Sequence, residues 1–381
     1  MRSTFACSPD GPTARRRRRP PMLYFFVALA SLTFALPLFR HEHWIYRAFE
    51  FPRWQKFVLF SLLLLALLWY RTPGLTWWAC TIAVTIMTLM LARMIHPFTR
   101  WGTKQVPDFP KTFARGHSLR LLIWNVWQDN HAWAPFFTHL ERLQPDVVLL
   151  AETHPAWADR VSHLRERYPH GAEYLSDNTY GMLLLSRYPL ESTQVAFLIE
   201  EGVPSLHAVL RLPQGTGIRL HCVHPKPPSP TENTHATERD GELLLVAKTA
   251  SQETAPVIVM GDLNDVAWSY TTTLFQKMSG LLDPRRGRGF FNTFHARIPF
   301  MRVPLDHIFC SRDFNVVRME RLPACGSDHF PMFIELMLVR SEALKPDEHE
   351  SAQPHEVAIA EDKIERAIEV STAENPGKLD R

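Results

Sequence analysis

Residues 257–264 read VIVMGDLN: four consecutive apolar residues, a glycine, and then an aspartate and an asparagine separated by one leucine. The apolar run predicts a buried strand, and the polar residues after it predict the start of a loop. Residues two apart in an extended segment point the same way, so Asp262 and Asn264 would face one spot. A carboxylate there can orient a water molecule, and an amide can donate to a phosphoryl oxygen. Taken alone, the same tetrapeptide also fits an ordinary Asx-type turn.

Four more polar signatures stand at the ends of apolar runs elsewhere in the chain. In order they are Trp124-Asn125-Val126, Leu150-Ala151-Glu152-Thr153, Leu305-Asp306-His307 and Gly326-Ser327-Asp328-His329. Loops at strand ends are the usual place for a functional site on a rigid scaffold. We therefore expect these groups to meet at one edge of a sheet. Such a set can hold a hard metal ion and cleave a phosphate ester.

The metal ligands are expected at the ends of two neighbouring strands. Glu152 follows five apolar residues, and Asn125 ends the preceding strand and offers an amide oxygen beside it. A carboxylate and an amide, together with water, suit Mg²⁺. Asp328 is expected to lean toward the same ion. For Glu152 considered alone, a helix N-cap or a solvated carboxylate is the ordinary alternative.

The two Asp-His pairs predict a histidine held by a carboxylate. Adjacent strand residues point to opposite faces, so Asp306 and His307 cannot both serve one site. We expect Asp306 to orient His329 from the next strand, which fixes its tautomer and stabilises the imidazolium. His224, at the end of the run His221-Cys222-Val223-His224, is expected to donate to a phosphate oxygen.

Charge is distributed unevenly along the 381 residues. Residues 1–117 hold 16 Lys/Arg against 4 Asp/Glu, residues 118–339 hold 20 against 24, and residues 340–381 hold 6 against 11. The central segment therefore has a net charge of −4. Proteins that live on duplex DNA usually present a basic face, because phosphate neutralisation supplies most non-specific affinity. The composition therefore argues against that class.

Three apolar runs, at 22–39, 55–70 and 76–95, predict three transmembrane helices after a basic N-terminus at 1–21. The first run alone also fits a cleaved signal peptide, but two further runs and the lack of a small-x-small cleavage site disfavour that reading. The second run is short and could be re-entrant. With three spans, the N-terminal side carries 7 positive residues against 4 in the 40–56 loop. The positive-inside rule then predicts a multi-pass inner-membrane protein with its later residues extracytoplasmic.

The remaining segments divide into a linker, a domain and a tail. Residues 96–117 are polar and contain proline, which predicts a linker. Residues 118–339 carry the strand signals, and 340–381 are charged and predict a disordered tail with one helix around 357–370. The domain, from about residue 117 onward, is expected to fold and work without the membrane helices.

Short runs rich in Val, Leu and Ile alternate with turn residues through the central domain. Strands are predicted at 118–126, 146–152, 180–187, 194–199, 205–212, 217–224, 256–261, 303–310, 314–319 and 329–338, and helices at 132–143, 156–167 and 236–251. Strands in runs, flanked by a few helices, predict two sheets packed face to face with helices outside.

With these motifs in this order, residues 118–339 resemble the endonuclease/exonuclease/phosphatase superfamily, related to deoxyribonuclease and neutral sphingomyelinases, and more narrowly its bacterial membrane-anchored members. The resemblance implies a four-layer α/β sandwich of two mixed sheets. It implies Asn125 and Glu152 at the metal with Asp328 near it, and His224 on the phosphate. It also implies Asp262 and Asn264 at the attacking water, and Asp306 orienting His329. Tyr180 and Arg187 fall on a stretch similar to family members and are weaker candidates for substrate binding.

The expected function is a membrane-anchored phosphohydrolase that uses Mg²⁺, or Mn²⁺, to activate water against a phosphodiester or phosphomonoester. The substrate stays open between a lipid or small phosphodiester and nucleic acid, and no protein partner is predicted. The alternative is a catalytically inactive binding protein, tethered to the bilayer and built on the same fold.

Overall fold

Two β-sheets form the centre of the computed structural model, which describes residues 21–110, 118–339 and 351–374. The strands are β1 Ser118–Asn125, β2 Val147–Ala151, β3 His170–Tyr174, β4 Met182–Ser186, β5 Leu190–Ala196, β6 Ser205–Arg211, β7 Gly217–Val223, β8 Val257–Asp262, β9 Asp306–Cys310, β10 Phe314–Arg321 and β11 Met332–Leu338. One sheet has the order β10-β11-β1-β2-β4-β3, and the other has the order β5-β6-β7-β8-β9. Both sheets mix parallel and antiparallel pairs.

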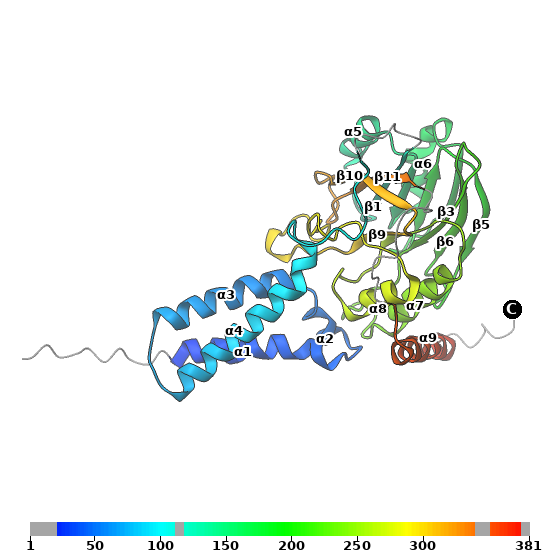
Figure 1. Ribbon diagram of the computed structural model, residues 1–381. Helices are drawn as coiled ribbons and strands as arrows, with labels where there is room; N and C mark the ends of the chain where they lie inside the picture. The colour runs from blue at the N-terminus through cyan, green and yellow to red at the C-terminus, as the bar shows by residue number, and fades with distance from the viewer. Residues whose placement is uncertain (1–20, 111–117, 340–350, 375–381) are drawn as a thin grey trace, which may run out of the picture.

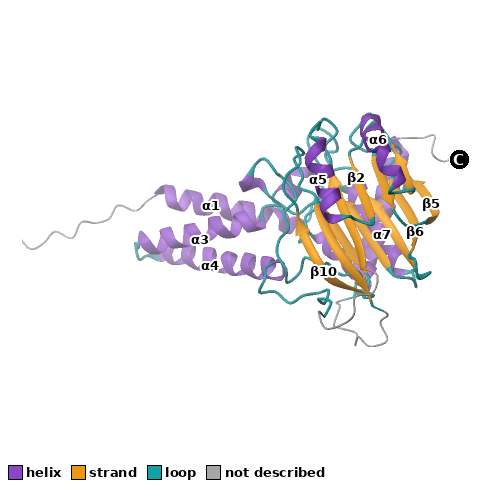
Figure 2. Cartoon of the chain, turned by 90° about the horizontal axis from the view of Figure 1, so that it is seen from above, coloured by secondary structure: helices purple, strands orange, loops and turns teal. Residues whose placement is uncertain are grey.

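Helices cover the outer face of each sheet. They are α5 Trp133–Leu143, α6 Pro155–Val161, α7 Thr237–Ser251 and α8 Tyr270–Ser279, with short 3₁₀ turns at Ser162–Glu166 and Pro299–Met301. Figure 2 shows α5 and α6 on one face of the strands and α7 behind them. The layers are therefore helix, sheet, sheet and helix, which confirms the predicted sandwich of two mixed sheets with flanking helices.

Alternation along the strands divides the core into layers. Leu121 and Ile123 of β1 pack between the sheets with Ile258 and Met260 of β8. The intervening residues, such as Trp124, face α5 and α6 on the outside. Because successive strand side chains point to opposite faces, each apolar strand supplies two hydrophobic layers. This is why these strands read as continuous apolar runs.

The strand directions bring the polar signatures to one edge. β1 and β2 are parallel, as are β7 and β8, so their carboxyl ends lie together within each sheet. β9 is antiparallel to β8, and its first residue, Asp306, is paired directly with Asp262. The ends of β1, β2, β8 and β9 therefore place Asn125, Glu152, Asp262 and Asp306 around a common space.

Two elements of the domain have no counterpart in the sequence prediction, β3 and α8. The α8 sequence is rich in threonine, which disfavours a helix interior. Capping residues at both ends stabilise the helix. Ser269 Oγ accepts from the Thr272 backbone N–H at 2.8 Å, and Gly280 has the left-handed φ of 70° that ends many helices. The helix is therefore indicated by the capping residues that flank it and not by the helix propensity of its interior residues.

The N-terminal helices form an extended bundle beside the domain. They are α1 Pro21–Ala35, α2 Trp44–Ala48, α3 Arg53–Trp69 and α4 Leu75–Ile95, with 3₁₀ turns at Leu36–Phe39 and His96–Phe98. Figure 1 shows α1, α3 and α4 side by side, with α2 at the end near the domain. By length and composition, two described segments could cross a membrane, Met22–Phe39 and Leu75–Phe98. The predicted middle span has only the 17 residues of α3, so three spans are not established.

The segment expected to be a linker differs from that expectation over its described residues, 96–110. Val106 is fully buried in the core between the sheets, and Phe98 packs with Trp268. The Phe109 backbone N–H donates to the Val316 carbonyl oxygen at 2.9 Å. A few apolar side chains in a polar sequence thus hold the segment on the domain. A fragment that starts near residue 117 would leave the Val106 position in the core empty.

The C-terminal segment also packs on the domain. Helix α9, Pro354–Glu374, extends the helix predicted at 357–370 and lies against α7. The two helices approach closely at Gly241, where an added Cβ would lie 2.2 Å from the Cβ of Ala367. The expectation of a disordered tail is therefore wrong for 351–374, while its parts at 340–350 and 375–381 lie outside the described residues.

Candidate active site

Asn125 joins two carboxylates that come from different sheets. Its amide nitrogen donates to Glu152 Oε1 at 2.7 Å and to Asp262 Oδ2 at 3.0 Å. Its amide oxygen accepts from the Trp127 backbone N–H at 3.0 Å. An amide oxygen has two lone pairs, so the role of this oxygen at a metal stays a prediction. The Asn125 nitrogen holds Glu152 and Asp262 in place.

His329 lies between two aspartates, as the sequence predicted for Asp306. Its Nδ1 is 2.7 Å from Asp306 Oδ2, and its Nε2 is 3.6 Å from Asp262 Oδ2. The His329 backbone N–H donates to Ser327 Oγ at 2.9 Å, and the Ser327 hydroxyl donates to the Asn125 carbonyl oxygen at 2.8 Å. Burial alone lowers the pKa of His329, but the charges of Asp306 and Asp262 raise it to about 10. The imidazole is therefore protonated at neutral pH.

The turn after β8 is both an Asx turn and part of the site, the two interpretations that its sequence allowed. The Asn264 backbone N–H donates to Asp262 Oδ1 at 3.0 Å, which is an Asx turn, and both side chains line the same cavity. Asn264 has a φ of 50°, a strained value for a residue other than glycine. Arg239 holds it there by donating to the Asn264 carbonyl oxygen at 2.7 Å. At Gly261 (φ 145°) a Cβ would lie 1.9 Å from the Val223 carbonyl oxygen, so only glycine fits.

His224 follows β7 and approaches Asp262 from the other side. Its Nε2 lies 4.0 Å from Asp262 Oδ2, and its buried Nδ1 has no hydrogen-bond partner among the described residues. Burial lowers the pKa of His224 despite the nearby charge of Asp262. His224 lines the cavity, and its contact to a phosphate oxygen stays a prediction.

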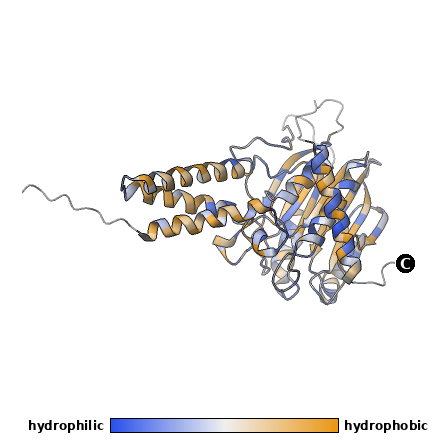
Figure 3. Cartoon of the chain, turned by 90° about the horizontal axis from the view of Figure 1, so that it is seen from below, coloured by the Kyte–Doolittle hydropathy of each residue, from blue (hydrophilic) through white to orange (hydrophobic). Residues whose placement is uncertain are grey.

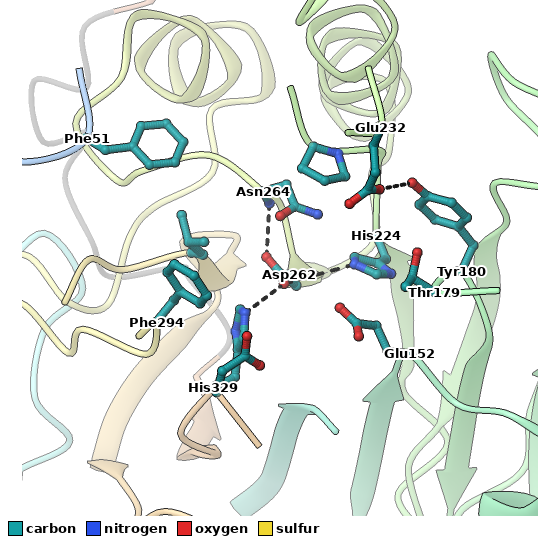
Figure 4. A pocket seen from close by; sticks show the side chains of 13 residues that line it. Phe51, Glu152, Thr179, Tyr180, His224, Glu232, Asp262, Asn264, Phe294 and His329 are labelled. Atoms are coloured by element: carbon teal, nitrogen blue, oxygen red, sulfur yellow. Dashed lines mark hydrogen bonds and ion pairs between the residues drawn. The ribbon is translucent and has the colours of Figure 1, made fainter. Parts of the chain in front are cut away.

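These groups surround a cavity of about 250 Å³ (Figure 4). It is lined by Phe51, Glu152, Thr179, Tyr180, His224, Pro227, Glu232, Asp262, Asn264, Phe294, Leu305, Asp328 and His329. Sequence reasoning missed the cavity residues Phe51, Thr179, Pro227, Glu232, Phe294 and Leu305. Phe51 is the least expected of them, because it belongs to the segment between α2 and α3.

The two weaker candidates have different outcomes. Tyr180 lines the cavity, and its hydroxyl donates to Glu232. Arg187 does not reach the cavity: its guanidinium lies 3.5 Å from Asp146 and stacks over Tyr168. Arg187 directly follows β4, at the strand end opposite to the one that contributes to the cavity, so its placement at the site is wrong.

The donors at the cavity fit a divalent cation at Glu152. Burial raises the pKa of Glu152 to about 7, and the carboxylates of Asp262 and Asp328 add to that effect. Among the described residues, Asn125 is its only hydrogen-bond partner, and this largely buried carboxylate lies among other carboxylates, an arrangement that a cation would stabilise. Asp262, Asp306 and His329 also come within 4.8 Å of one another, a spacing that could hold a metal. The short His329–Asp306 hydrogen bond already occupies that pair, so a cation would fit better on the Glu152 side, where Asp328 lines the same cavity.

The Glu152 carboxylate predicts a pH-dependent stability in the absence of metal. Its folded pKa lies above the unfolded value, so its contribution is favourable at low pH and is lost as pH rises through about 7. In EDTA, Glu152→Gln should therefore melt roughly 3 °C or more above the unsubstituted protein at pH 8, and near it at pH 5. Added Mg²⁺ should raise the melting midpoint of the unsubstituted protein more than that of the variant.

Differential scanning calorimetry of the full chain in detergent measures both effects. Glu166→Gln, at an exposed position, is the matched control and should follow the unsubstituted protein. Equal Mg²⁺ stabilisation of Glu152→Gln and the unsubstituted protein would place the cation elsewhere.

The fold and the site together define a two-sheet α/β protein with carboxylates, an amide and a charged histidine around one cavity. Residues 122–329, more than half of the chain, match the model of the Endonuclease/Exonuclease/phosphatase family, and the chain belongs to that family. Members of this family are typically hydrolases that act on phosphoester bonds, and they generally use divalent metal ions. No curated protein matches the chain.

Several solved structures are similar to this chain at low sequence identity. TDP2 of D. rerio, complexed with a single-strand DNA product, is 19% identical, with a TM-score of 0.49 over 58% of this chain and 99% of its own. The human Nocturnin catalytic domain, with a bound sulfate anion, is 18% identical, with a TM-score of 0.47 over 58% and 95%. An endonuclease/exonuclease/phosphatase from Beutenbergia cavernae is 18% identical, with a TM-score of 0.46 over 59% and 72%.

Proposed function

We propose that the protein is a membrane-anchored, Mg²⁺- or Mn²⁺-dependent phosphohydrolase that cleaves a phosphate ester by direct attack of water. The observation that carries this proposal is the meeting of Glu152, Asp262, His224 and His329 around one cavity, with Asp306 hydrogen-bonded to His329. Serine, cysteine or lysine nucleophiles are not needed, because water is the nucleophile. A bound cation at Glu152 would offset charge on the phosphoryl group.

The side chains suit separate parts of the hydrolysis. Burial works to raise the pKa of Asp262, but the positive charge of His329 and the hydrogen bond from Asn125 hold it low, so Asp262 accepts a proton from the attacking water. The water oxygen bonds to phosphorus, the ester P–O bond breaks, and the departing alkoxide takes the proton on His329 Nε2. Proton transfer from Asp262 to His329, across the 3.6 Å that separates them, then restores both groups. Asn264 and His224 hold phosphoryl oxygens in place.

Anchoring in a bilayer is supported by the surface of the bundle. Large apolar side chains are exposed on α1, α3 and α4, including Phe25, Leu65 and Leu89, and Figure 3 shows these helices as predominantly hydrophobic. Contiguous apolar surface of this extent marks a membrane or protein contact. The 40–56 loop contacts the domain, so both lie on one side of the proposed membrane. Lys/Arg counts favour the extracytoplasmic, periplasmic side for them.

A panel of phosphodiesters and phosphomonoesters, tested on the full chain in detergent, separates the enzyme from a binding protein on the same fold. The proposal expects hydrolysis with Mg²⁺ or Mn²⁺ and none in EDTA. Plasmid DNA, RNA and phospholipid vesicles belong in the panel, because lipid and nucleic acid are both open as substrates. Turnover of no member, without thermal stabilisation by Mg²⁺, would favour the binding protein. Activity that survives EDTA would contradict the proposal.

A further inference from the structure

The cavity wall includes a residue from the membrane-proximal segment. Phe51 stands two residues before α3 begins, at Arg53, and it lines the cavity together with Phe294. Figure 4 shows both rings on the side of the cavity opposite Glu152 and Tyr180. The site is therefore completed by the part of the chain that leads into an apolar helix.

Hydrogen bonds and ring contacts fix the start of α3 to the domain beside the cavity. Gln55 Nε2 donates to the carbonyl oxygens of Phe300 and Arg302 at 3.1 and 3.0 Å. The Trp54 ring lies 5.5 Å from that of Phe290. The start of α3 and the loop that carries Phe294 are thus held together, so the mouth of the cavity lies close to the surface of the proposed bilayer.

Apolar side chains around the start of α3 remain exposed. Phe300 is 76% exposed, Met301 47% and Trp54 40%. Phe300 and Met301 lie on the 3₁₀ turn that Gln55 holds, so their surface continues the apolar flank of α3. Aromatic and long apolar side chains at this position suit the boundary between head groups and acyl chains.

The cavity is small and its lining is acidic. Its volume of about 250 Å³ is below the range of about 300–1,000 Å³ that accommodates a whole drug-sized ligand. None of the described lining residues is Lys or Arg, whereas Glu152, Glu232, Asp262 and Asp328 are carboxylates. Proteins that follow a nucleic-acid backbone do so with basic grooves. The lining therefore lacks a basic groove for a nucleic-acid backbone, and the volume suits one head group, whose phosphate the proposed cation would offset, with the rest of the substrate outside.

We propose that the substrate is a lipid phosphate ester held in the bilayer, and that Phe51 is a specificity-determining residue for it. The head group enters past Phe51, while the apolar anchor stays in the bilayer beside Trp54, Phe300 and Met301. This inference rests on the proposed hydrolase function and adds the substrate class. The bond that breaks is the phosphoester bond described above.

The test compares a lipid and a soluble ester with the same full-length protein. The protein is reconstituted with vesicles of phosphatidylcholine and phosphatidylglycerol, and bis(4-nitrophenyl) phosphate is the soluble probe. Phe300→Ser/Met301→Ser should lower lipid turnover by roughly tenfold and leave turnover of the soluble ester unchanged. Phe51→Ser should raise KM for lipid more than KM for the soluble ester. Ile368→Ser/Val370→Ser, at exposed positions of α9, is the control and should change neither.

The outcomes distinguish this inference from the function on which it rests. Hydrolysis of the soluble ester with no lipid turnover, or equal lipid turnover by Phe300→Ser/Met301→Ser, overturns the lipid assignment and leaves the hydrolase standing. Faster cleavage of a single-stranded oligonucleotide than of lipid, falling steeply with added salt, also overturns it. Failure to hydrolyse any of these probes overturns both.

Discussion

Replacing His329 by alanine is expected to lower kcat for phosphoester hydrolysis by about 10²- to 10⁴-fold, the range typical of a lost general acid or base. In the folded protein Asp306 holds the His329 ring 3.6 Å from Asp262, and the His329 pKa of about 10 keeps the ring charged. Removing the ring deletes both the proton donor and the charge that keeps Asp262 ionised. Steady-state kinetics of the full chain with Mg²⁺ measures the effect, with KM expected to change less than kcat.

Two further variants separate catalysis from damage to the fold. His163→Ala, on an exposed residue, should retain full activity. Asp306→Asn keeps the shape of the side chain but removes the negative charge that raises the pKa of His329. It should therefore lower kcat less than His329→Ala does, and it should shift the alkaline limb of the pH profile to lower pH. Activity of His329→Ala within a few-fold of the unsubstituted protein would remove His329 from the mechanism.

Arg47→Ala is expected to destabilise the whole protein, although Arg47 lies outside the catalytic domain. Its guanidinium lies 2.6 Å from Asp240 and 3.4 Å from Glu50, and all three groups are buried. Asp240 and Glu50 hold its pKa above the usual range despite burial. Truncating one partner of a buried ion pair costs about 3–5 kcal/mol. Asp240 keeps Lys363 at 3.0 Å, so we expect about 3 kcal/mol here.

The measurement is thermal unfolding of the full chain in detergent by calorimetry. A loss of about 3 kcal/mol corresponds to a midpoint lower by roughly 6–12 °C. Because Arg239 bonds both Asp240 and the Asn264 carbonyl oxygen, kcat should fall as well. Arg100→Ala, at an exposed position, should melt like the unsubstituted protein. An unchanged midpoint for Arg47→Ala would show that the bundle and the domain are energetically independent.

The parts of the site predicted from sequence are those written locally at strand ends. Glu152 and Asp262 lie at the carboxyl ends of strands that belong to parallel pairs, and His329 precedes β11, which runs antiparallel to β1, so all three reach the same edge. The orientation of a side-chain amide, in contrast, depends on partners that are distant in the sequence. Asn125 was predicted to offer its oxygen to a metal, and nothing in the sequence indicated that its nitrogen would bridge Glu152 and Asp262.

The parts that sequence reasoning missed depend on contacts between distant segments. Phe51 reaches the cavity from the segment before α3, which packs on Trp268 and is hydrogen-bonded to the loop around Phe300. Val106 and helix α9 join the domain through a few apolar side chains in stretches that read as polar. Hydrophobic periodicity averages over such stretches and cannot register single buried residues. Arg187 was predicted at the site because its sequence stretch is similar to that of family members. In the structure it lies at the end of β4 that is far from the cavity.

The most direct test of the proposed mechanism is the Mg²⁺-dependent turnover of bis(4-nitrophenyl) phosphate by full-length Asp262→Asn, measured beside Asp129→Asn. Asp262 contacts Asn125, approaches His329 and His224, and takes the proton from the attacking water in the proposed reaction. Asp129 is exposed and lies outside the cavity. We predict that Asp262→Asn lowers kcat by about 10²-fold or more, that Asp129→Asn is fully active, and that EDTA abolishes the activity of both. Full activity of Asp262→Asn, or hydrolysis that persists in EDTA, would contradict a metal-dependent phosphohydrolase at this cavity.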